Sequence, residues 1–412
     1  MYKSHYENVP FEIPENWCWT TLGELFDIVS AKRVLQSDWQ RTGIPFYRAR
    51  EIVRLSYEGY VDNDLFITEE HYNNLKKSYG VPEPSDIMLS AVGTIGRAYV
   101  VRNNDVFYYK DASVLCLRNV YHLNSEFIKW ILSSDLLQNQ MYENSKGTTV
   151  DTITIEKANS YFLPLPPIDE QYRIVKLLCE WDAYINDINK NKEEVLNNIR
   201  TCKSKILDLA ISGKLVPQDP NDEPAIELLK RINPDFQPCD NSHYENLPQG
   251  WTVCKIKDIF NITMGQSPTG ESINGVKCIE LHQGKIHFTE SYLSQSGVYT
   301  DQPTKIAEVD SLLLCVRAPV GVLNITQRKI CIGRGLCALK PKYEIDNLYW
   351  LFILTAYKDY FESNATGSTF KAISGDTIKN AVIKLPPLQE QKRILSSIIS
   401  LYESLDAITA EL

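Results

Sequence analysis

The chain has 412 residues, 43% of them hydrophobic and 23% charged, which is typical of folded proteins but too long for a single hydrophobic core. Its formal net charge of −9 excludes an overall basic character, so any nucleic-acid surface must be a local patch or be completed by partner chains. No apolar run approaches the roughly 20 residues of a membrane helix. The ten cysteines form no C-x-x-C pair, so we expect no metal site, reduced thiols and a cytoplasmic location.

Residues 1–165 predict a first mixed domain. Short β-rich runs such as Ser113–Leu117 are bounded by turn residues, and a helical stretch covers Ser125–Tyr142. Lys and Arg number 16 here against 21 Asp and Glu, so this half is not basic.

Residues 166–215 predict one long helix. Pro166 and Pro167 exclude helix before them, and acidic residues follow in the expected first turn. Apolar residues then recur in steps of four and three, with Lys192 as the one polar interruption, which is the pattern of a coiled-coil seam. The predicted seam positions are Ile174, Leu178, Trp181, Ile185, Ile188, Val195, Ile199, Cys202, Ile206 and Leu209. A helix of this length is a spacer about 65 Å long.

After a proline-rich linker at residues 216–240, the chain repeats itself. Ile13–Trp17 recurs as Leu247–Trp251, and the run from Pro166 to Ile174 recurs from Pro386 to Ile394. Residues 241–385 therefore predict a second domain like the first, with 15 Lys and Arg against 13 Asp and Glu. Residues 386–412 predict a second, shorter seam helix, with seam positions Ile394, Ile398, Leu401, Leu405, Ile408 and Leu412.

The duplication predicts an α+β protein with two tandem, similar mixed α/β domains, each followed by a coiled-coil helix. The two helices are expected to pack antiparallel as a spacer with pseudo-twofold symmetry. The alternative is that each seam binds a helix of another chain. The distal helix is about half as long as the first, and a truncated sequence, a naturally short chain and completion by another chain all remain open.

Catalytic motifs are absent from the sequence. It has no G-x-x-x-x-G-K-[ST] phosphate loop, no H-E-x-x-H and no G-x-S-x-G. The Leu-Pro-Pro runs lack the polar residue and the aromatic residue that an amino-methyltransferase loop needs, and they are typical of helix starts. We expect no catalytic residue and no bound cofactor.

The two copies, the Pro-Pro-x-x-Glu-Gln-x-x-Ile runs and the segment ISGKLVPQDPNDEPA at 211–225 together resemble the specificity subunits of Type I restriction–modification enzymes. The resemblance implies two target-recognition domains that read a split target in double-stranded DNA. It also implies helices that dock two methyltransferase subunits carrying S-adenosylmethionine, and an assembly that restriction subunits join. The rival hypothesis is a protein–protein scaffold that keeps this frame without binding DNA.

Under this resemblance, the candidate DNA contacts are side chains that make paired hydrogen bonds to bases or that reach phosphates. We align Gly43–Ile52 of the first domain with Gly275–Gly284 of the second. The predicted contacts are Lys32, Arg33, Arg48 and Arg50 in the first domain and Gln266, Ser267, His282, Gln283, Lys285, Arg317, Arg334 and Lys371 in the second.

Overall fold

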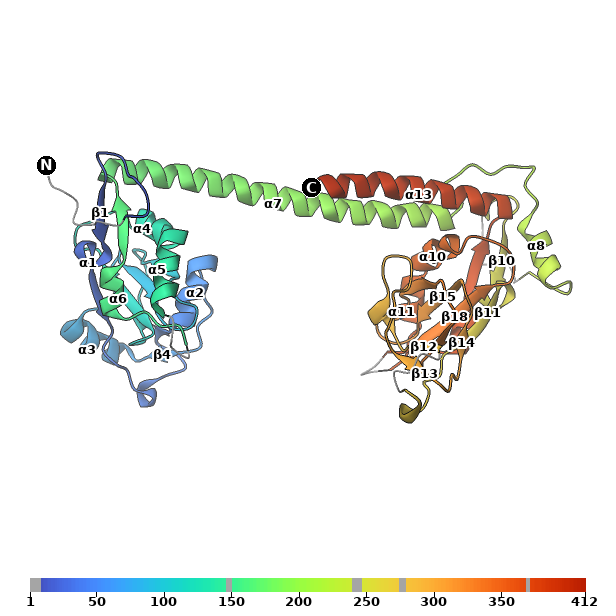
Figure 1. Cartoon of the computed structure of the whole chain (residues 1–412), viewed down its shortest axis with the longest axis horizontal. Coiled ribbons are helices and arrows are strands. Elements are labelled where there is room, and N and C mark those ends of the chain that lie inside the picture. Colours follow the sequence, from blue (N-terminus) through green and yellow to red (C-terminus); the bar gives the residue numbers. More distant parts are fainter. Residues whose placement is uncertain (1–8, 146–149, 239–246, 274–278, 368–370) are drawn as a thin grey trace. The chain divides into compact units, whose positions relative to one another are not determined.

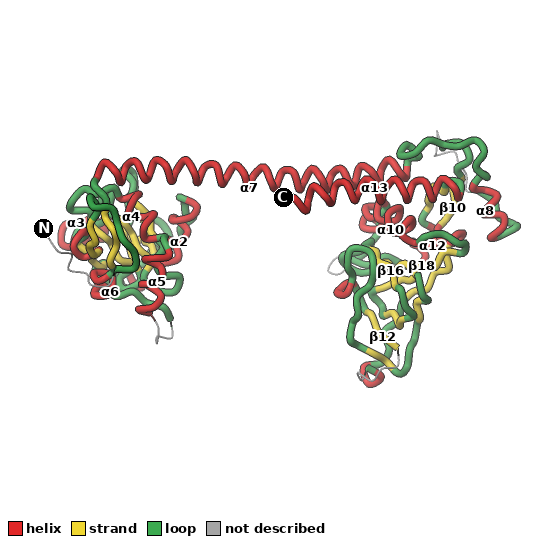
Figure 2. Tube along the Cα trace, turned by 45° about the horizontal axis from the view of Figure 1, so that its top comes forward, coloured by secondary structure: helices red, strands yellow, loops and turns green. Residues whose placement is uncertain are grey.

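The chain folds into two compact units, Met1–Ile188 and Asn189–Leu412, and each is described by itself. The computed structural model describes residues 9–145, 150–238, 247–273, 279–367 and 371–412. Helices and sheets are mixed within each unit (Figure 1), and Figure 2 separates helix, strand and loop along the trace. The predicted two-domain α+β class is confirmed.

The first unit contains a four-stranded antiparallel sheet, a three-stranded sheet and a two-stranded ribbon. The four-stranded sheet has the order β2 (Asp27–Ser30), β8 (Val114–Arg118), β5 (Ile87–Ser90), β6 (Ala98–Val100). The three-stranded sheet has the order β4 (Phe66–Ile67), β3 (Ile44–Tyr47), β7 (Tyr108–Tyr109), and the ribbon pairs β1 (Cys18–Thr21) with β9 (Phe162–Leu165). Strand β5 is buried throughout, which explains its continuous apolar run.

Helices of the first unit begin at side-chain caps where the sequence supplies them. Thr21 caps the first helix by accepting from the N–H of Glu24, and Asn124 and Thr154 cap two others. The helices are α1 (Leu22–Leu25), α2 (Ala49–Glu58), α3 (Glu69–Tyr79), α4 (Ser125–Leu132), α5 (Asp135–Ser145), α6 (Ile155–Ser160) and the start of α7 (Ile168–Ile211), with a 3-10 turn η1 (Gln36–Asp38).

The second unit repeats this arrangement. Its four-stranded sheet has the order β11 (Phe260–Met264), β18 (Leu336–Pro341), β15 (Ser311–Cys315), β16 (Leu323–Thr326). A second sheet has the order β13 (Tyr299–Thr300), β12 (Ile279–His282), β17 (Ile330–Ile332), β14 (Ile306–Ala307), and β10 (Thr252–Lys255) pairs with β19 (Val382–Leu385). In both units the sheet that is not purely antiparallel contains one parallel pair, β3 with β7 or β12 with β17.

The remaining helices of the second unit enclose one hydrophobic core around Trp350 and Phe260. They are α8 (Ala225–Ile232), α9 (Ile256–Ile259), α10 (Asn347–Ala356), α11 (Lys358–Ser363), α12 (Gly375–Asn380) and α13 (Leu388–Glu411), with 3-10 turns η2 (Gly270–Ser272) and η3 (Lys285–His287). Helix α8 lies within the segment expected to be a linker, and its Leu228 and Leu229 are buried in this core.

Helix α13 lies antiparallel to the part of α7 that belongs to the second unit (Figure 1). The Lys203 ammonium pairs with Asp406 at 2.5 Å, and the Tyr402 hydroxyl donates to the Lys203 carbonyl at 3.1 Å. The Lys192 ammonium donates to the carbonyl of Leu412, which places that residue opposite the polar interruption of the seam.

Part of the predicted seam is displaced in this pair. Ile199, Ile394 and Ile398 are buried as expected, whereas Leu209, Leu401 and Ile408 are 40%, 39% and 47% exposed. The contacts fall instead on Leu207, Ala210, Leu395, Ile399 and Tyr402. Because α7 packs on the core of the domain as well as on α13, its buried face is turned away from a strict heptad stripe.

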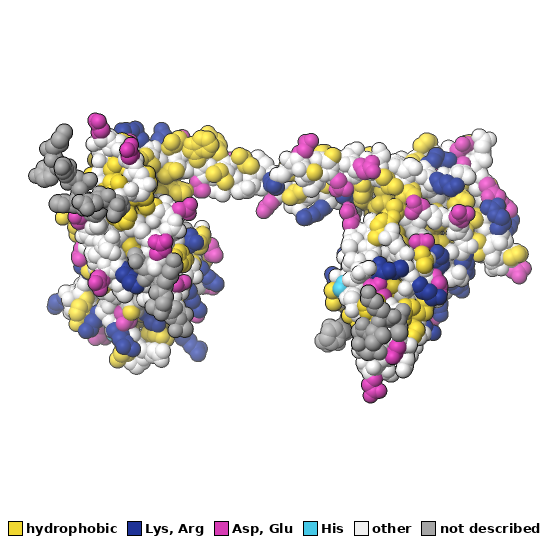
Figure 3. All heavy atoms as spheres, viewed as in Figure 1, with side chains coloured by type: hydrophobic (Ala, Val, Ile, Leu, Met, Phe, Trp, Pro, Cys, Tyr) yellow, Lys and Arg dark blue, Asp and Glu magenta, His cyan; other side chains and the backbone are white. Residues whose placement is uncertain are grey.

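The first part of α7 presents an exposed apolar strip. Ile174 and Val175 pack against the core of the first unit, but the seam positions Trp181, Ile185 and Ile188 are 59%, 52% and 64% exposed. Leu177 and Tyr184 extend the same strip, which is visible as a yellow patch along α7 in Figure 3. No described residue of the first unit covers these side chains, so here the seam is available to another helix.

A buried carboxylate fixes the start of α13. Glu390 is fully buried and accepts from the indole Nε1 of Trp251 at 3.0 Å and from the amide of Gln218 at 3.1 Å. Burial raises the pKa of Glu390, and the two hydrogen bonds oppose that rise. Arg393, one turn later, pairs with Asp222 at 2.6 Å. The 211–225 segment therefore binds the first turns of α13 through Gln218 and Asp222.

The equivalent tryptophan of the first unit lacks this partner. The indole nitrogen of Trp17 is buried without a hydrogen bond to any described residue, and Glu170, the counterpart of Glu390, accepts from Asn16 at 3.2 Å.

This difference gives a matched pair of variants. Trp251→Phe should lower the free energy of unfolding by about 2 kcal/mol, because it removes a hydrogen bond to a buried charged group. Trp17→Phe should cost clearly less, since no such bond is lost. Urea unfolding followed by circular dichroism measures both, and equal losses would contradict the role given to Glu390.

Candidate nucleic-acid interface

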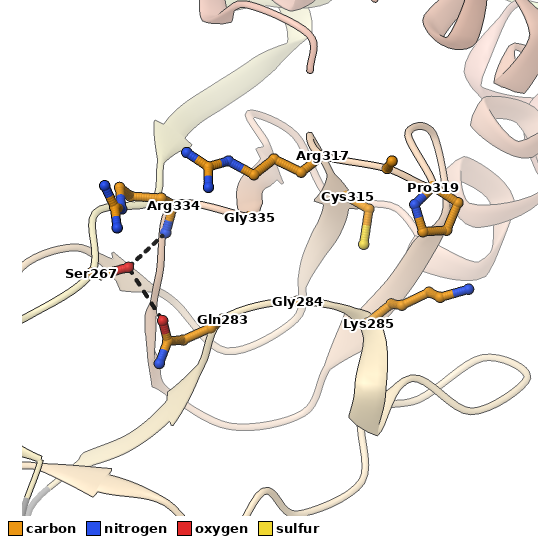
Figure 4. Close-up of a pocket in the computed structure, with 10 residues that line it drawn as sticks. Ser267, Gln283, Gly284, Lys285, Cys315, Arg317, Pro319, Arg334 and Gly335 are labelled. Atoms are coloured by element: carbon orange, nitrogen blue, oxygen red, sulfur yellow. Dashed lines mark hydrogen bonds between the residues drawn. The ribbon is translucent and has the colours of Figure 1, made fainter. Parts of the chain in front are cut away.

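Five of the predicted DNA contacts of the second unit line one cleft of about 220 Å³ (Figure 4). Each follows the end of a strand, because β11, β12, β15 and β17 all finish at this edge. The five residues are Ser267, Gln283, Lys285, Arg317 and Arg334. Residues spread over 68 positions of sequence are thus brought to one place, and three of them carry positive charge.

Close backbone packing shapes this cleft. A Cβ on Gly265 would lie 2.1 Å from the Gly333 carbonyl, and one on Gly335 would lie 2.2 Å from the Gln283 carbonyl. Glycine is therefore required where the turn after β17 crosses its neighbours. The Ser267 hydroxyl accepts from the N–H of Arg334 and donates to the Gln283 side chain, each at 3.3 Å.

His282 does not face the cleft. Its side chain is fully buried, and Nε2 lies 3.0 Å from the carboxylate of Glu280. Burial lowers the pKa of His282 more than the neighbouring carboxylate raises it, so the ring is neutral at pH 7. A base contact by this residue is incompatible with the structure, because the ring has no access to the surface.

The partner of His282, Glu280, is the centre of a buried ion cluster. Its carboxylate also accepts from the Arg328 guanidinium, at 3.0 Å from Nη2, and from the N–H of Ser296. Burial alone would raise the pKa of Glu280, but these bonds lower it to about 2. Sequence patterns do not predict this cluster, since Glu280 and Arg328 are 48 residues apart.

The two other predicted contacts of the second unit lie outside the cleft-lining set. Gln266 and Lys371 are exposed, and the backbone carbonyl of Lys371 accepts from Ala318 at 3.1 Å. Ile286 was not predicted, yet its side chain is 88% exposed beside Lys285. An apolar side chain at such a place suits contact with a thymine methyl group.

Backbone hydrogen bonds show which residues correspond in the two units. In the first unit the N–H of Lys110 donates to the Tyr47 carbonyl at 2.8 Å, just beyond the parallel pair β3 and β7. In the second unit the N–H of Gly333 donates to the His282 carbonyl at 2.7 Å, just beyond β12 and β17. Tyr47 therefore corresponds to His282.

This correspondence corrects the sequence alignment by three residues. Arg48 occupies the position of Gln283, and Arg50 that of Lys285, whereas the sequence alignment matched Arg48 to Glu280. The apolar runs before these residues are too short and too different to fix the register without the strand pairing.

Arg48 and Arg50 meet in one cluster of four charged side chains. The carboxylate of Glu51, a buried residue, accepts from Nε of Arg48 at 3.1 Å and from Nη2 at 3.0 Å. The exposed carboxylate of Asp64 accepts from Nη2 of Arg48 at 2.6 Å and from Nη2 of Arg50 at 2.7 Å. The predicted guanidiniums are thus held side by side, and sequence reasoning missed Asp64.

Both carboxylates of this cluster are ionised. Burial would raise the pKa of Glu51, but the hydrogen bonds from Arg48 and Arg50 lower it overall. The hydrogen bond from Arg50 lowers the pKa of Asp64. The two negative charges of this cluster therefore cancel its two positive charges. Figure 3 likewise shows positive and negative side chains mixed on the face in view.

Lys32 and Arg33 are not part of this cluster. The backbone N–H of Lys32 donates to the Tyr108 hydroxyl at 3.0 Å, and its ammonium lies 5.3 Å from the ring centroid of Tyr79. Lys32 lines a separate cleft of about 320 Å³ that also contains Arg118. Arg33 is exposed.

Within the described residues, no three His, Cys, Asp or Glu side chains are grouped to hold a metal ion. None of the helices in that part of the chain is long and apolar enough to cross a membrane.

Comparison with known proteins identifies the class of molecule that this fold and these clefts define. The family model described as Type I restriction modification DNA specificity domain matches residues 14–198 and again residues 248–412. The chain therefore belongs to this family, carries its domain twice, and is a non-catalytic specificity subunit.

Individual relatives are similar in sequence to this chain along nearly its whole length. A chain named as the MjaX type I restriction enzyme specificity subunit of Methanocaldococcus jannaschii is 28% identical over 396 residues, covering 93% of this chain and 86% of the relative. The type I restriction enzyme EcoAI specificity subunit of Escherichia coli is 21% identical over 481 residues, covering 97% and 79%.

Solved structures share the fold. The HsdS subunit from Thermoanaerobacter tengcongensis has a TM-score of 0.62 at 20% identity, covering 98% of this chain and 93% of that one. A chain from a study of complex assembly and conformational transition of the type I R-M system has a TM-score of 0.67 at 23% identity, covering 98% and 94%.

The ion cluster around Glu280 predicts a pH-dependent stability. The folded-state pKa of Glu280 is lowered to about 2 from an ordinary 4.5, so its contribution is present above about pH 4.5 and is lost as the pH falls toward 2. Glu280→Gln should therefore destabilise the chain at pH 7, and the gap to wild type should narrow below pH 4.5. Urea unfolding at pH 7, 5 and 3 measures this, and a gap independent of pH would contradict it.

Proposed function

We propose that this chain reads a DNA target made of two half-sites, one for each recognition domain. The observation that supports this most directly is the correspondence of the two sites. The same strand ends position Arg48 and Arg50 in one domain and Gln283 and Lys285 in the other. One backbone frame with different hydrogen-bonding side chains suits two half-sites of different sequence.

The chain is proposed to act with partners that carry the chemistry. Two methyltransferase subunits would bind S-adenosylmethionine and modify an adenine in each half-site, and restriction subunits would join them. Because the net charge of this chain is −9, the partner chains would add phosphate contacts to the few that its own Lys and Arg side chains make.

The exposed strip on α7 is a proposed docking surface for a methyltransferase helix. Leu177, Trp181, Tyr184, Ile185 and Ile188 lie at helical spacing on one face and are each more than half exposed. A strip of this kind is unfavourable in water unless an amphipathic helix covers it.

Selection from a randomised duplex library tests the proposal. The full chain assembled with its methyltransferase subunits should enrich two short sequences at a fixed spacing, and binding should weaken steeply with salt. Enrichment of no sequence would refute DNA reading and would favour the scaffold hypothesis.

Gln283→Ala should relax selectivity in one half-site only, by about tenfold at one base pair, because the variant removes both the donor and the acceptor of the carboxamide. Lys340→Ala is a matched control in the same unit, since Lys340 is bonded to the Val309 carbonyl outside the cleft. Relaxation of both half-sites would contradict a separate reader in each domain.

The helices are proposed to set the number of unread base pairs. Seven residues inserted after Ile188 would lengthen α7 by about 10 Å while nearly preserving its face. The preferred gap between half-sites should then increase by about three base pairs, as sequencing of the selected duplexes would show. An unchanged gap would refute the spacer role.

A further inference from the structure

The cleft of the second domain carries positive charge that no acid offsets. Lys285, Arg317 and Arg334 line it, and no Asp or Glu is among the described residues that line it with them. The charged group of none of the three forms a hydrogen bond or ion pair with another described residue. In Figure 4 the side chain of Arg317 extends toward Arg334, and the ammonium of Lys285 points away from both. Three charged donors are therefore free to bind a ligand.

The thiol in this cleft does not offset the charge either. Burial raises the pKa of Cys315 to about 11, although Lys285 acts to lower that pKa. The thiol is therefore uncharged at pH 7. Ser267 and Gln283, which line the same cleft, are polar but neutral. The described wall of the cleft thus has three positive charges and no negative charge.

The first domain neutralises the corresponding cation. Arg50, at the position of Lys285, is paired with Glu51 and Asp64. The residue after Lys285 is Ile286, so an apolar side chain stands where the first domain has Glu51.

Strand pairing gives the counterpart of the second acid. The N–H of Phe46 donates to the Leu65 carbonyl at 2.9 Å, and the N–H of Leu281 donates to the Val298 carbonyl at 2.8 Å. The residue before each of these acceptors is Asp64 in the first domain and Gly297 in the second. The second domain therefore lacks both of the carboxylates that hold the arginine cluster of the first.

The two arginines of the cleft have no cationic counterpart in the first domain. Val92 replaces Arg317, because each lies two residues past an equivalent strand, β5 or β15, and forms an isolated bridge there. Asp111 replaces Arg334, because each follows the residue whose N–H bonds to the end of the parallel pair. Lys110, which precedes Asp111, carries the opposite charge to it. The unpaired positive cleft is therefore a feature of the second domain alone.

An anion suits such a cleft better than the edge of a base does. Like charges in one cleft repel one another, and an anion between them removes that repulsion. Each phosphate group of DNA carries one negative charge, and Lys and Arg bind it without regard to sequence. Base edges are uncharged, and the described residues that line the cleft include no aromatic side chain on which a base could stack.

We propose that Lys285, Arg317 and Arg334 bind phosphate groups of the DNA backbone, and that their cleft anchors the second domain on the duplex. This inference rests on the proposed function and adds to it a contact that is independent of sequence. Base reading in this domain is then left to neutral side chains such as Gln283. Because the first domain has no such cleft, the anchor belongs to one half-site only.

The salt dependence of binding tests the proposal, with the full chain assembled with its methyltransferase subunits. Arg317→Gln and Arg334→Gln each remove one positive charge and keep a side chain that donates hydrogen bonds. Each should weaken binding to matched and mismatched duplexes alike by about tenfold. Each should also reduce the slope of the logarithm of the binding constant against the logarithm of salt concentration by about one.

Lys340→Gln is the matched control. It removes the same charge in the same unit, from a side chain bonded to the Val309 carbonyl outside the cleft. Affinity and salt slope should both stay at their wild-type values. Thermal unfolding of each variant confirms that the fold is retained.

Duplexes in which single phosphates are replaced by uncharged methylphosphonates locate the contact. The wild-type complex should bind more weakly when a phosphate is replaced at the half-site that Gln283→Ala relaxes. The double variant Arg317→Gln, Arg334→Gln should be insensitive to the same replacement, because the side chains that bind the phosphate are gone. Equal sensitivity of the wild type and the double variant would overturn the inference.

The remaining outcomes separate the inference from the proposed function. A variant that loses preference at one base pair while it keeps the wild-type salt slope would show that its arginine reads a base, and the inference would be wrong. A wild-type complex that binds DNA without selecting any sequence would overturn the proposed function, whereas the salt slopes would still test the cleft.

Discussion

The parallel strand pair in each domain is the constraint on which the candidate sites depend. In both domains the pair is only two residues long by register, Phe46–Tyr47 with Tyr108–Tyr109 and Leu281–His282 with Cys331–Ile332. Parallel strands need a crossover connection, so each pair ties together segments far apart in sequence. Side chains that follow such a pair start from buried, hydrogen-bonded backbone, which gives the exposed ends defined positions.

Charge is organised locally in these domains rather than as a basic face. In the first domain two acids pair with two arginines, and in the second the buried Glu280 pairs with Arg328. Guanidiniums that are already held in place lose less conformational entropy on binding than free ones. Because the cluster has no net charge, we expect it to contribute more to selectivity than to the affinity for phosphates. Under the proposed function, phosphate affinity would depend on exposed residues such as Arg33 and on partner chains, because the net charge of this chain is −9.

The larger features were predictable because they repeat or extend over many residues. The duplication located two domains, and the 3.5-residue spacing located both helices. The seam was only partly right, since α7 also packs on a domain and buries Leu207 and Ala210 instead of Leu209. Five of the eight contacts predicted in the second domain line one cleft, but His282 is buried. The ion pairs of Asp64 and Arg328 and the exposed position of Ile286 were not predicted. These depend on strand register and on pairs distant in sequence, which local patterns do not encode.

The corrected register changes how the two domains are compared. With Arg48 at the position of Gln283, the differences fall on exposed side chains, while the flanking strands keep the same backbone bonds. Under the proposed function, substitution at a few positions after β3 or β12 would change the target of a domain without altering its core. The exception is Asp64, because its exchange for the glycine of the other copy removes one of the two carboxylates that orient both arginines. Under the proposed function, selectivity in the first domain would thus depend on the whole cluster and not on any one arginine.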